Sequence, residues 1–164
     1  MIKVKDVIRN YISGETVVKA LRGVNLDVND GEFLSIAGPS GSGKTTLLNL
    51  IGCIDKIDSG EIIINDKSVS NMKKKENTYF RRENLGFVFQ SFNLIPVLTA
   101  YENVGLSLSL LNINEMEKRE RAMNILNEVG LSGKEHSPPP KESGGQQQRV
   151  AMGRALVKKP SIVL

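Results

Sequence analysis

A glycine-rich stretch in the first third of the chain has the residue types that bind phosphate groups. It runs Gly38-Pro39-Ser40-Gly41-Ser42-Gly43-Lys44-Thr45, a glycine followed after four residues by Gly-Lys-Thr. Glycines allow the backbone to bend so that successive N–H groups point inward at an anion. A lysine adds a mobile cation, and a threonine hydroxyl is a hard oxygen ligand that suits Mg²⁺. The stretch therefore predicts a site for a triphosphate with Mg²⁺.

A second stretch, Ser143-Gly144-Gly145-Gln146, has the features of a helix start that a ligand can approach. Ser143 is a favourable N-cap residue, and Gln146 occupies the capping-box position three residues later. The two glycines leave backbone amides sterically open. On its own the pattern is more typical of an ordinary capped helix after a loop. Its interpretation as a binding element depends on the first stretch.

The elements around the first stretch indicate an α/β fold. Apolar and polar residues alternate through the first thirty residues, with turn signals between, which predicts antiparallel strands. Residues 33–37 predict a short buried strand that leads into the glycine-rich stretch, and a helix is expected from Lys44 onward. Two further short strands are expected at residues 62–64 and 87–89.

The segment from 91 to 145 is expected to be helical. Thr99 with Glu102 predicts a capping box, and Asn114 with Glu117 resembles a second one.

A third helix is expected to start after Ser143 and to run until Pro160, and residues 161–164 are expected to begin a strand.

Composition is that of an ordinary globular domain of 164 residues, with a net charge of +4. Cys53 is the only cysteine, which excludes an internal disulfide and favours a reducing cytosol. The N-terminal residues lack the apolar core of a signal peptide, and no apolar run approaches the roughly 18 residues that a spanning helix needs. Work at a membrane would therefore require a partner that spans it.

Two basic clusters, residues 73–75 and 81–82, raise the alternative of nucleic-acid binding. A solvated helix face explains them better, and no aromatic residues are interleaved with them to stack on bases. We expect no nucleic-acid partner.

The two stretches, with Gln90 at the end of a strand between them, resemble the Walker A, Q-loop and signature motifs of ATP-binding-cassette (ABC) transporter ATP-binding subunits. The resemblance covers the whole chain. Residues 38–48 and 89–96 are most similar to the lipoprotein-releasing and macrolide-export branch. The resemblance implies a P-loop NTPase core with an antiparallel β subdomain and an α-helical subdomain. The implied parts are an antiparallel β subdomain at 1–32, the P-loop core at 33–90, the helical subdomain at 91–145, and the signature helix with the start of the Walker B strand at 146–164.

The resemblance also implies roles for individual residues. Lys44 and Gln90 would be catalytic, and Thr45 and Gln90 would contact Mg²⁺. Tyr11 would stack on the adenine. The residues implied to contact ATP are Tyr11, Gly38, Pro39, Ser40, Gly41, Ser42, Gly43, Lys44, Thr45, Thr46, Ser143, Gly144, Gly145 and Gln146.

The implied partners are a second ATP-binding subunit and a transmembrane permease. Residues 143–146 would contact the ATP held by the second subunit, so that two subunits enclose two nucleotides. The helical segment from about Ser91 would dock onto the permease, which places the protein in the cytoplasm, peripheral on the inner face of the cell membrane. The implied function is to couple ATP binding and hydrolysis to that permease, in export or lipoprotein release.

The chain departs from the family pattern at three places. Relatives carry an Asp and a Glu directly after the strand that begins at 161, and neither occurs before Leu164, so the fold is expected to be incomplete at its C-terminus and residues 1–164 deficient in hydrolysis. Glu142 stands where relatives usually carry Leu, and Gly153 where they usually carry Ala.

Two alternatives for the function are kept open. One is a DNA-repair or ribosome-associated ATPase, whose usual coiled-coil insertions or tandem cassettes are not seen here. The other is a non-enzymatic fragment that binds nucleotide weakly or not at all.

Overall fold

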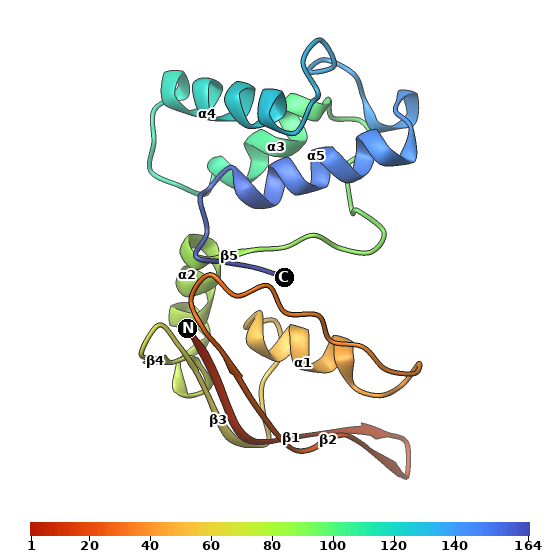
Figure 1. Cartoon of the computed structure of the whole chain (residues 1–164), viewed down its shortest axis with the longest axis vertical. Coiled ribbons are helices and arrows are strands. Elements are labelled where there is room, and N and C mark those ends of the chain that lie inside the picture. The colour runs from red at the N-terminus through yellow and green to blue at the C-terminus, as the bar shows by residue number, and fades with distance from the viewer. The chain divides into compact units, whose positions relative to one another are not determined.

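A computed structural model describes all 164 residues, and these divide into two compact units, Met1–Tyr79 and Phe80–Leu164 (Figure 1). The α/β class is confirmed, with strands and helices in both units. The elements of the first unit are β1 (Ile2–Ser13), β2 (Thr16–Val28), α1 (Lys44–Ile51), β3 (Ser59–Ile64), β4 (Lys67–Ser68) and the short helix η1 (Val69–Asn71). Helix α2 (Lys74–Asn84) crosses the boundary, and the second unit continues with β5 (Leu85–Gly86), α3 (Ala100–Leu108), α4 (Glu115–Glu128), η2 (Pro139–Lys141), α5 (Gly144–Leu156) and β6 (Ile162–Val163).

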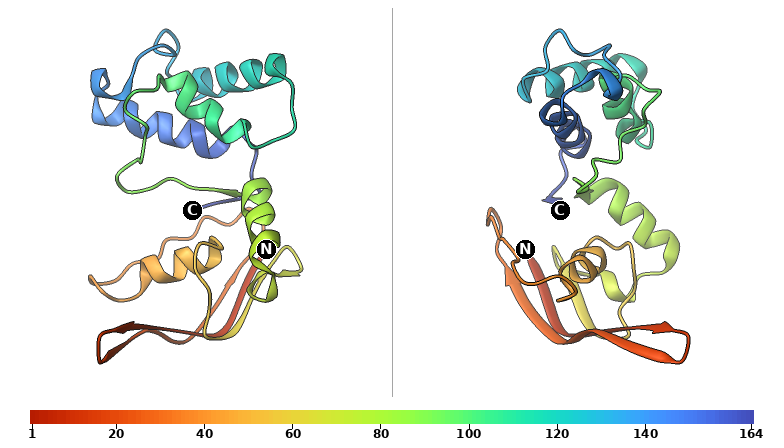
Figure 2. Two further views of the ribbon diagram at one scale, coloured as in Figure 1. Left: turned by 180° about the vertical axis from the view of Figure 1, so that it is seen from behind. Right: turned by 90° about the vertical axis from the view of Figure 1, so that its right-hand side faces the viewer.

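The first unit is built on a four-stranded antiparallel sheet with the order β2-β1-β3-β4. The antiparallel strands expected in the first thirty residues are confirmed as the β1–β2 hairpin, and the strand expected at 62–64 lies within β3. Alternate residues of β1, such as Ile2 and Val4, are buried because successive side chains point to opposite faces. Helix α1 lies over the concave face of this sheet (Figure 2) and buries Leu47 and Leu50.

The expectation of a buried strand at residues 33–37 is wrong for this structure. The segment pairs with no strand, and Phe33 is 96% exposed. An apolar run forms a strand only where a neighbouring strand accepts and donates its backbone hydrogen bonds. No strand among residues 1–164 takes that place, so the backbone before the glycine-rich loop is extended and unpaired.

The second unit packs α3, α4 and α5 around one apolar core (Figure 1). The capping box of α3 is confirmed, because the Thr99 side chain accepts from Glu102 N–H and the Glu102 carboxylate accepts from Thr99 N–H. Only half of the second box forms. Asn114 Oδ1 accepts from Glu117 N–H at 2.8 Å, and no reciprocal bond is present. The core residues are Ala100, Val104, Leu108, Ala122, Leu126, Leu131, Val150 and Val157.

The same unit contains a short parallel ladder of β5, which precedes the three helices in the chain, with β6, which follows them. The strand expected at 87–89 is wrong in its position, because the strand is Leu85–Gly86 and residues 87–89 lie outside it; Val88 N–H still donates to Leu164 O at 2.8 Å. Helix α5 ends at Leu156, four residues before Pro160, and Lys158 Nζ then donates to the carbonyls of Arg82 and Leu85 at 2.7 and 2.9 Å. No helix has the length and apolar character required to cross a bilayer.

We expect the substitution Gly153→Ala to raise the free energy of unfolding of the second unit by about 1 kcal/mol, because glycine inside a helix is unfavourable by that amount. A Cβ at this position would meet Val104, Ile125 and Val129 at 3.4, 3.8 and 3.8 Å, which are ordinary packing distances. Urea unfolding followed by helical circular dichroism measures the change.

Gly86→Ala is the matched control, since its Cβ would lie 2.6 Å from the carbonyl oxygen of Ala155 and must destabilise the same unit. A loss of stability in Gly153→Ala would mean that the Val104 side chain cannot shift enough to accommodate the added methyl group.

Candidate nucleotide-binding site

The glycine-rich loop turns sharply at two left-handed glycines, Gly41 and Gly43, with φ of 78° and 90°. Side chains other than glycine seldom adopt this conformation. Gly43 is doubly required, because a Cβ there would lie 2.6 Å from the Ala20 carbonyl oxygen and 2.9 Å from Leu21 Cδ2. The loop is therefore held close to β2 at its end and stays exposed from Gly38 to Ser42.

Helix α1 begins directly after the loop, and its first amides have no partner within the helix. The first helical bond runs from Leu47 N–H to Gly43 O at 2.9 Å, so the N–H groups of Lys44, Thr45 and Thr46 precede it. Gly43 provides no side-chain cap, and the first turn contains no acidic residue. These amides and the positive end of the helix dipole are left available to an anion.

The side chain of Lys44 folds back over its own loop. Its ammonium donates to Gly38 O at 2.8 Å, to Pro39 O at 2.7 Å and to Ser42 Oγ at 3.3 Å. An ammonium has three protons, and all three have an acceptor here. The ammonium is thus held at the centre of the loop, where the oxygens of an anion can replace the loop oxygens as its hydrogen-bond acceptors.

The donors gathered here match an oxygen-rich anion with several phosphate groups. The start of α1 offers amides that have no partner within the helix, Lys44 adds a positive charge, and Thr45 is exposed with a hydroxyl suited to a hard cation. No cluster of three His, Cys, Asp or Glu residues capable of holding a metal ion exists among the 164 residues. The residues fit a Mg²⁺–nucleotide, and they define a P-loop nucleotide-binding protein.

Tyr11 lies on β1, and its polar group is already engaged. Its hydroxyl donates to Asp55 Oδ2 at 2.7 Å, and the Arg9 guanidinium covers one ring face at 4.7 Å from the centroid. Burial acts to raise the pKa of Asp55, but the hydrogen bonds from Tyr11 and Lys56 and the charge of Arg9 outweigh it, and the pKa lies below its ordinary value. Sequence reasoning missed Asp55 and Arg9, since they are distant in the chain and form no local motif.

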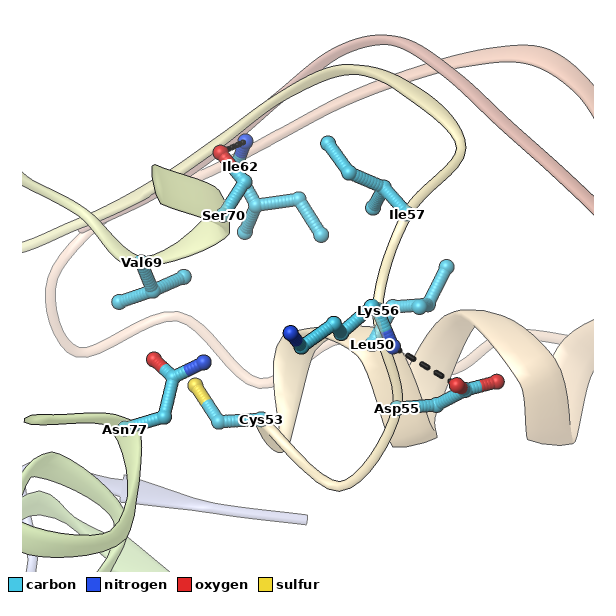
Figure 3. Close-up of a pocket in the computed structure, with 9 residues that line it drawn as sticks. All are labelled: Leu50, Cys53, Asp55, Lys56, Ile57, Ile62, Val69, Ser70 and Asn77. Carbon is cyan, nitrogen blue, oxygen red and sulfur yellow. Dashed lines mark hydrogen bonds between the residues drawn. The ribbon is translucent and has the colours of Figure 1, made fainter. Parts of the chain in front are cut away.

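A small pocket beside Asp55 is enclosed by α1, β3, η1 and α2 (Figure 3). Its volume of about 10 Å³ has room for about one water molecule and none for a nucleotide. Cys53 lies in its wall as a buried residue, as expected of a small apolar core side chain.

Gln90 follows the β5 ladder, in the second unit, and its side chain is exposed. The backbone after it forms two consecutive left-handed residues, Phe92 and Asn93, with φ of 60° and 48°. Phe87 and Phe89 stack before it, with ring centroids 5.8 Å apart.

Ser143 caps α5 in the way expected from the sequence. Its Oγ accepts from Gln146 N–H at 3.3 Å, and Gln146 Oε1 accepts from Ser143 N–H at 2.8 Å. A Cβ on Gly144 or Gly145 would meet nothing within 4 Å, so the helix start is open on this side. This segment and Gln90 belong to the second unit, whereas the phosphate loop and Tyr11 belong to the first.

Glu142, the residue before the cap, is 7% exposed, and neither carboxylate oxygen has a hydrogen-bond partner. The nearby amide of Gln147 donates to the carbonyls of Pro139 and Glu142 instead of this carboxylate. Burial raises the pKa of Glu142, and the charge of Lys134 offsets this only partly.

Comparison with known proteins extends the class to a family. A profile of the ABC transporter family matches residues 21–164. The ABC transporter ATP-binding protein MJ0796 of Methanocaldococcus jannaschii is 48% identical over the whole chain, which spans 72% of that protein. The lipoprotein-releasing system ATP-binding protein LolD of Bacteroides thetaiotaomicron is 43% identical, with all of this chain and 73% of LolD aligned. The macrolide export protein MacB of Hyphomonas neptunium is 44% identical over the whole chain, which is 25% of MacB.

A solved structure of the MJ0796 cassette, a dimer in a post-hydrolysis state bound to ADP and Pi, superposes with a TM-score of 0.91 at 47% identity. The superposition covers 99% of this chain and 72% of that one. The chain belongs to the ABC transporter family, among its ATP-binding subunits, and the resemblance inferred from the motifs is confirmed.

Proposed function

We propose that this chain binds MgATP at the Gly38–Thr46 loop and serves a transporter in which ATP binding and hydrolysis drive a membrane permease of the export or lipoprotein-release type. The observation that carries the proposal is the Lys44 ammonium centred over the loop, next to the first amides of α1, which have no partner within the helix. Lys44 would hold the β- and γ-phosphates, and Thr45 would contact Mg²⁺. Gln90 would contact the same Mg²⁺ and the attacking water. These roles rest on the family pattern.

The proposal extends to the other predicted site residues. Tyr11 would stack on adenine through the ring face opposite Arg9, with Asp55 holding the ring in place. The open start of α5, Ser143–Gln146, would contact the nucleotide of a second subunit, a reading supported by the dimer that MJ0796 forms. A permease partner would place the protein in the cytoplasm, on the inner face of the cell membrane. LolD and MacB, among the relatives, favour the export or lipoprotein-release branch.

We expect residues 1–164 to bind MgATP but to release phosphate no faster than background. The loop supplies the binding groups, while no Asp–Glu pair follows β6 within these residues to activate water. Titration with a fluorescent ATP analogue measures the binding, and a coupled phosphate assay measures turnover. Steady phosphate release would refute the expected hydrolysis deficiency, and absence of MgATP binding would refute the proposed function itself.

A further inference from the structure

The segment between β5 and α3 carries Gln90 and contains no regular structure, so its shape depends on where it is anchored. Its upstream end is fixed by the bond from Val88 N–H to Leu164 O at 2.8 Å. Its downstream end is fixed by Asn103 of α3, whose amide group accepts from Ile95 N–H and donates to the carbonyls of Ile95 and Leu98. Asn103 is fully buried.

The middle of the segment is held by Arg154. One guanidinium nitrogen donates to Asn93 O at 2.6 Å, and the other donates to Phe92 O. These two carbonyls belong to the consecutive left-handed residues, a conformation that asparagine tolerates and that is strained for phenylalanine. It persists only where the surroundings hold it. A rigid two-pronged donor is suited to holding two adjacent carbonyls at once.

Arg154 lies in the last turn of α5, the helix that begins with the Ser143 cap. The helix has 13 residues and is therefore about 20 Å long. One rigid element thus has the open start Ser143–Gln146 at one end and a clamp on the Gln90 segment at the other. A displacement of the helix start is transmitted to the clamped carbonyls, because a packed helix moves as a body.

We propose that Arg154 is a positioning residue. It fixes the backbone two and three residues after Gln90, and through that backbone it sets the place of the Gln90 side chain relative to the start of α5. The role of Gln90 at Mg²⁺–nucleotide belongs to the proposed function, and this part of the inference rests on it. The clamp on Phe92 and Asn93 stands on the hydrogen bonds alone.

The clamp is tested by amide hydrogen exchange in residues 91–94 of the full chain. We expect Arg154→Ala to speed exchange there by about tenfold or more, since both carbonyls lose a charged donor, with the helix amides of α5 unchanged. Arg154→Lys keeps one point charge without the fork and should restore part of the protection. Arg149→Ala, an exposed arginine on the same helix, is the matched control and should change nothing. Unchanged exchange in Arg154→Ala would overturn the clamp. If Arg154→Ala unfolds, Arg154→Lys is used instead, and exchange in residues 91–94 that stays at the wild-type rate would overturn the clamp.

The positioning role is tested by a double-mutant cycle with Gln90, read as affinity for a fluorescent ATP analogue with and without Mg²⁺. We expect Arg154→Ala to weaken Mg²⁺-dependent binding by about fivefold or more and to leave Mg²⁺-free binding unchanged. In the Gln90→Ala background it should have no further effect, because it acts through Gln90. If the effects of the two substitutions on Mg²⁺-dependent affinity add, Arg154 has a merely structural role and the positioning role is overturned. A wild-type chain that binds no nucleotide would defeat the proposed function, while the exchange experiment would still decide the clamp.

Discussion

Replacing Lys44 with alanine is expected to weaken MgATP binding by about a hundredfold or more. The ammonium is the only side-chain cation in the loop, and hydrogen bonds that involve a charged group contribute about 1.5–3 kcal/mol each. In this structure its protons bind Gly38 O, Pro39 O and Ser42 Oγ, acceptors that phosphate oxygens would replace. Titration with a fluorescent ATP analogue gives the change in affinity. In a chain that also contains the acidic pair expected after Leu164, the same substitution should abolish hydrolysis.

Two controls make this result specific. Lys73→Ala removes the same charge from an exposed lysine of the same unit, outside the loop, and should leave affinity unchanged. Lys44→Arg keeps the charge but replaces a compact ammonium with a planar fork, and it should not restore binding. Thermal unfolding of each variant checks that the first unit remains folded. Normal affinity in Lys44→Ala would show that the nucleotide binds elsewhere.

Replacing Glu142 with leucine is expected to raise the free energy of unfolding of the second unit by about 1–3 kcal/mol at pH 8. That is the range for leaving a buried polar group unsatisfied, and both oxygens of this carboxylate are buried without a partner. The corresponding rise in melting temperature is about 2–4 °C for each kcal/mol in a chain of this length. Thermal unfolding of the two proteins measures the difference.

The gain should depend on pH with a definite sign. Burial raises the pKa of Glu142, with Lys134 opposing it, so the folded state favours the protonated acid. The favourable contribution of that acid is fully present below the ordinary carboxyl pKa, and it is lost as the pH rises through the higher pKa of the folded state. The stability difference between Glu142→Leu and wild type should therefore be larger at pH 8 than at pH 5.

Two further variants isolate the cause. Glu142→Gln removes the charge but keeps the shape, and it should recover the pH-dependent part of the gain. Glu135 provides the matched control, because hydrogen bonds from its own N–H and from Gly133 N–H keep the pKa of its carboxyl below the ordinary value. Glu135→Gln should lose stability at high pH instead of gaining it. A Glu142→Leu difference that shrinks as the pH rises would contradict the assignment.

The local chemistry of this protein could be predicted from its sequence. The phosphate loop, the start of α1 and the caps at Thr99 and Ser143 are where the residue types place them. Each depends on a glycine torsion, a helix end or a hydrogen bond spanning three or four residues. Interactions over so short a distance along the chain are specified by neighbouring residues and need little from the rest of the molecule.

Tertiary structure decided the features that join residues far apart in the chain. Tyr11 meets Asp55 across 44 positions, and Arg154 reaches Phe92 across 62. No local pattern marks either pair, because only the packing of several elements brings them within hydrogen-bond distance. Residues 33–37 have the composition of a buried strand and lie exposed, since a strand also needs a partner that its own residues cannot supply. Local residue types thus determined the conformation of the loop and the donors that it offers, and long-range packing determined which side chains hold the surrounding backbone in place.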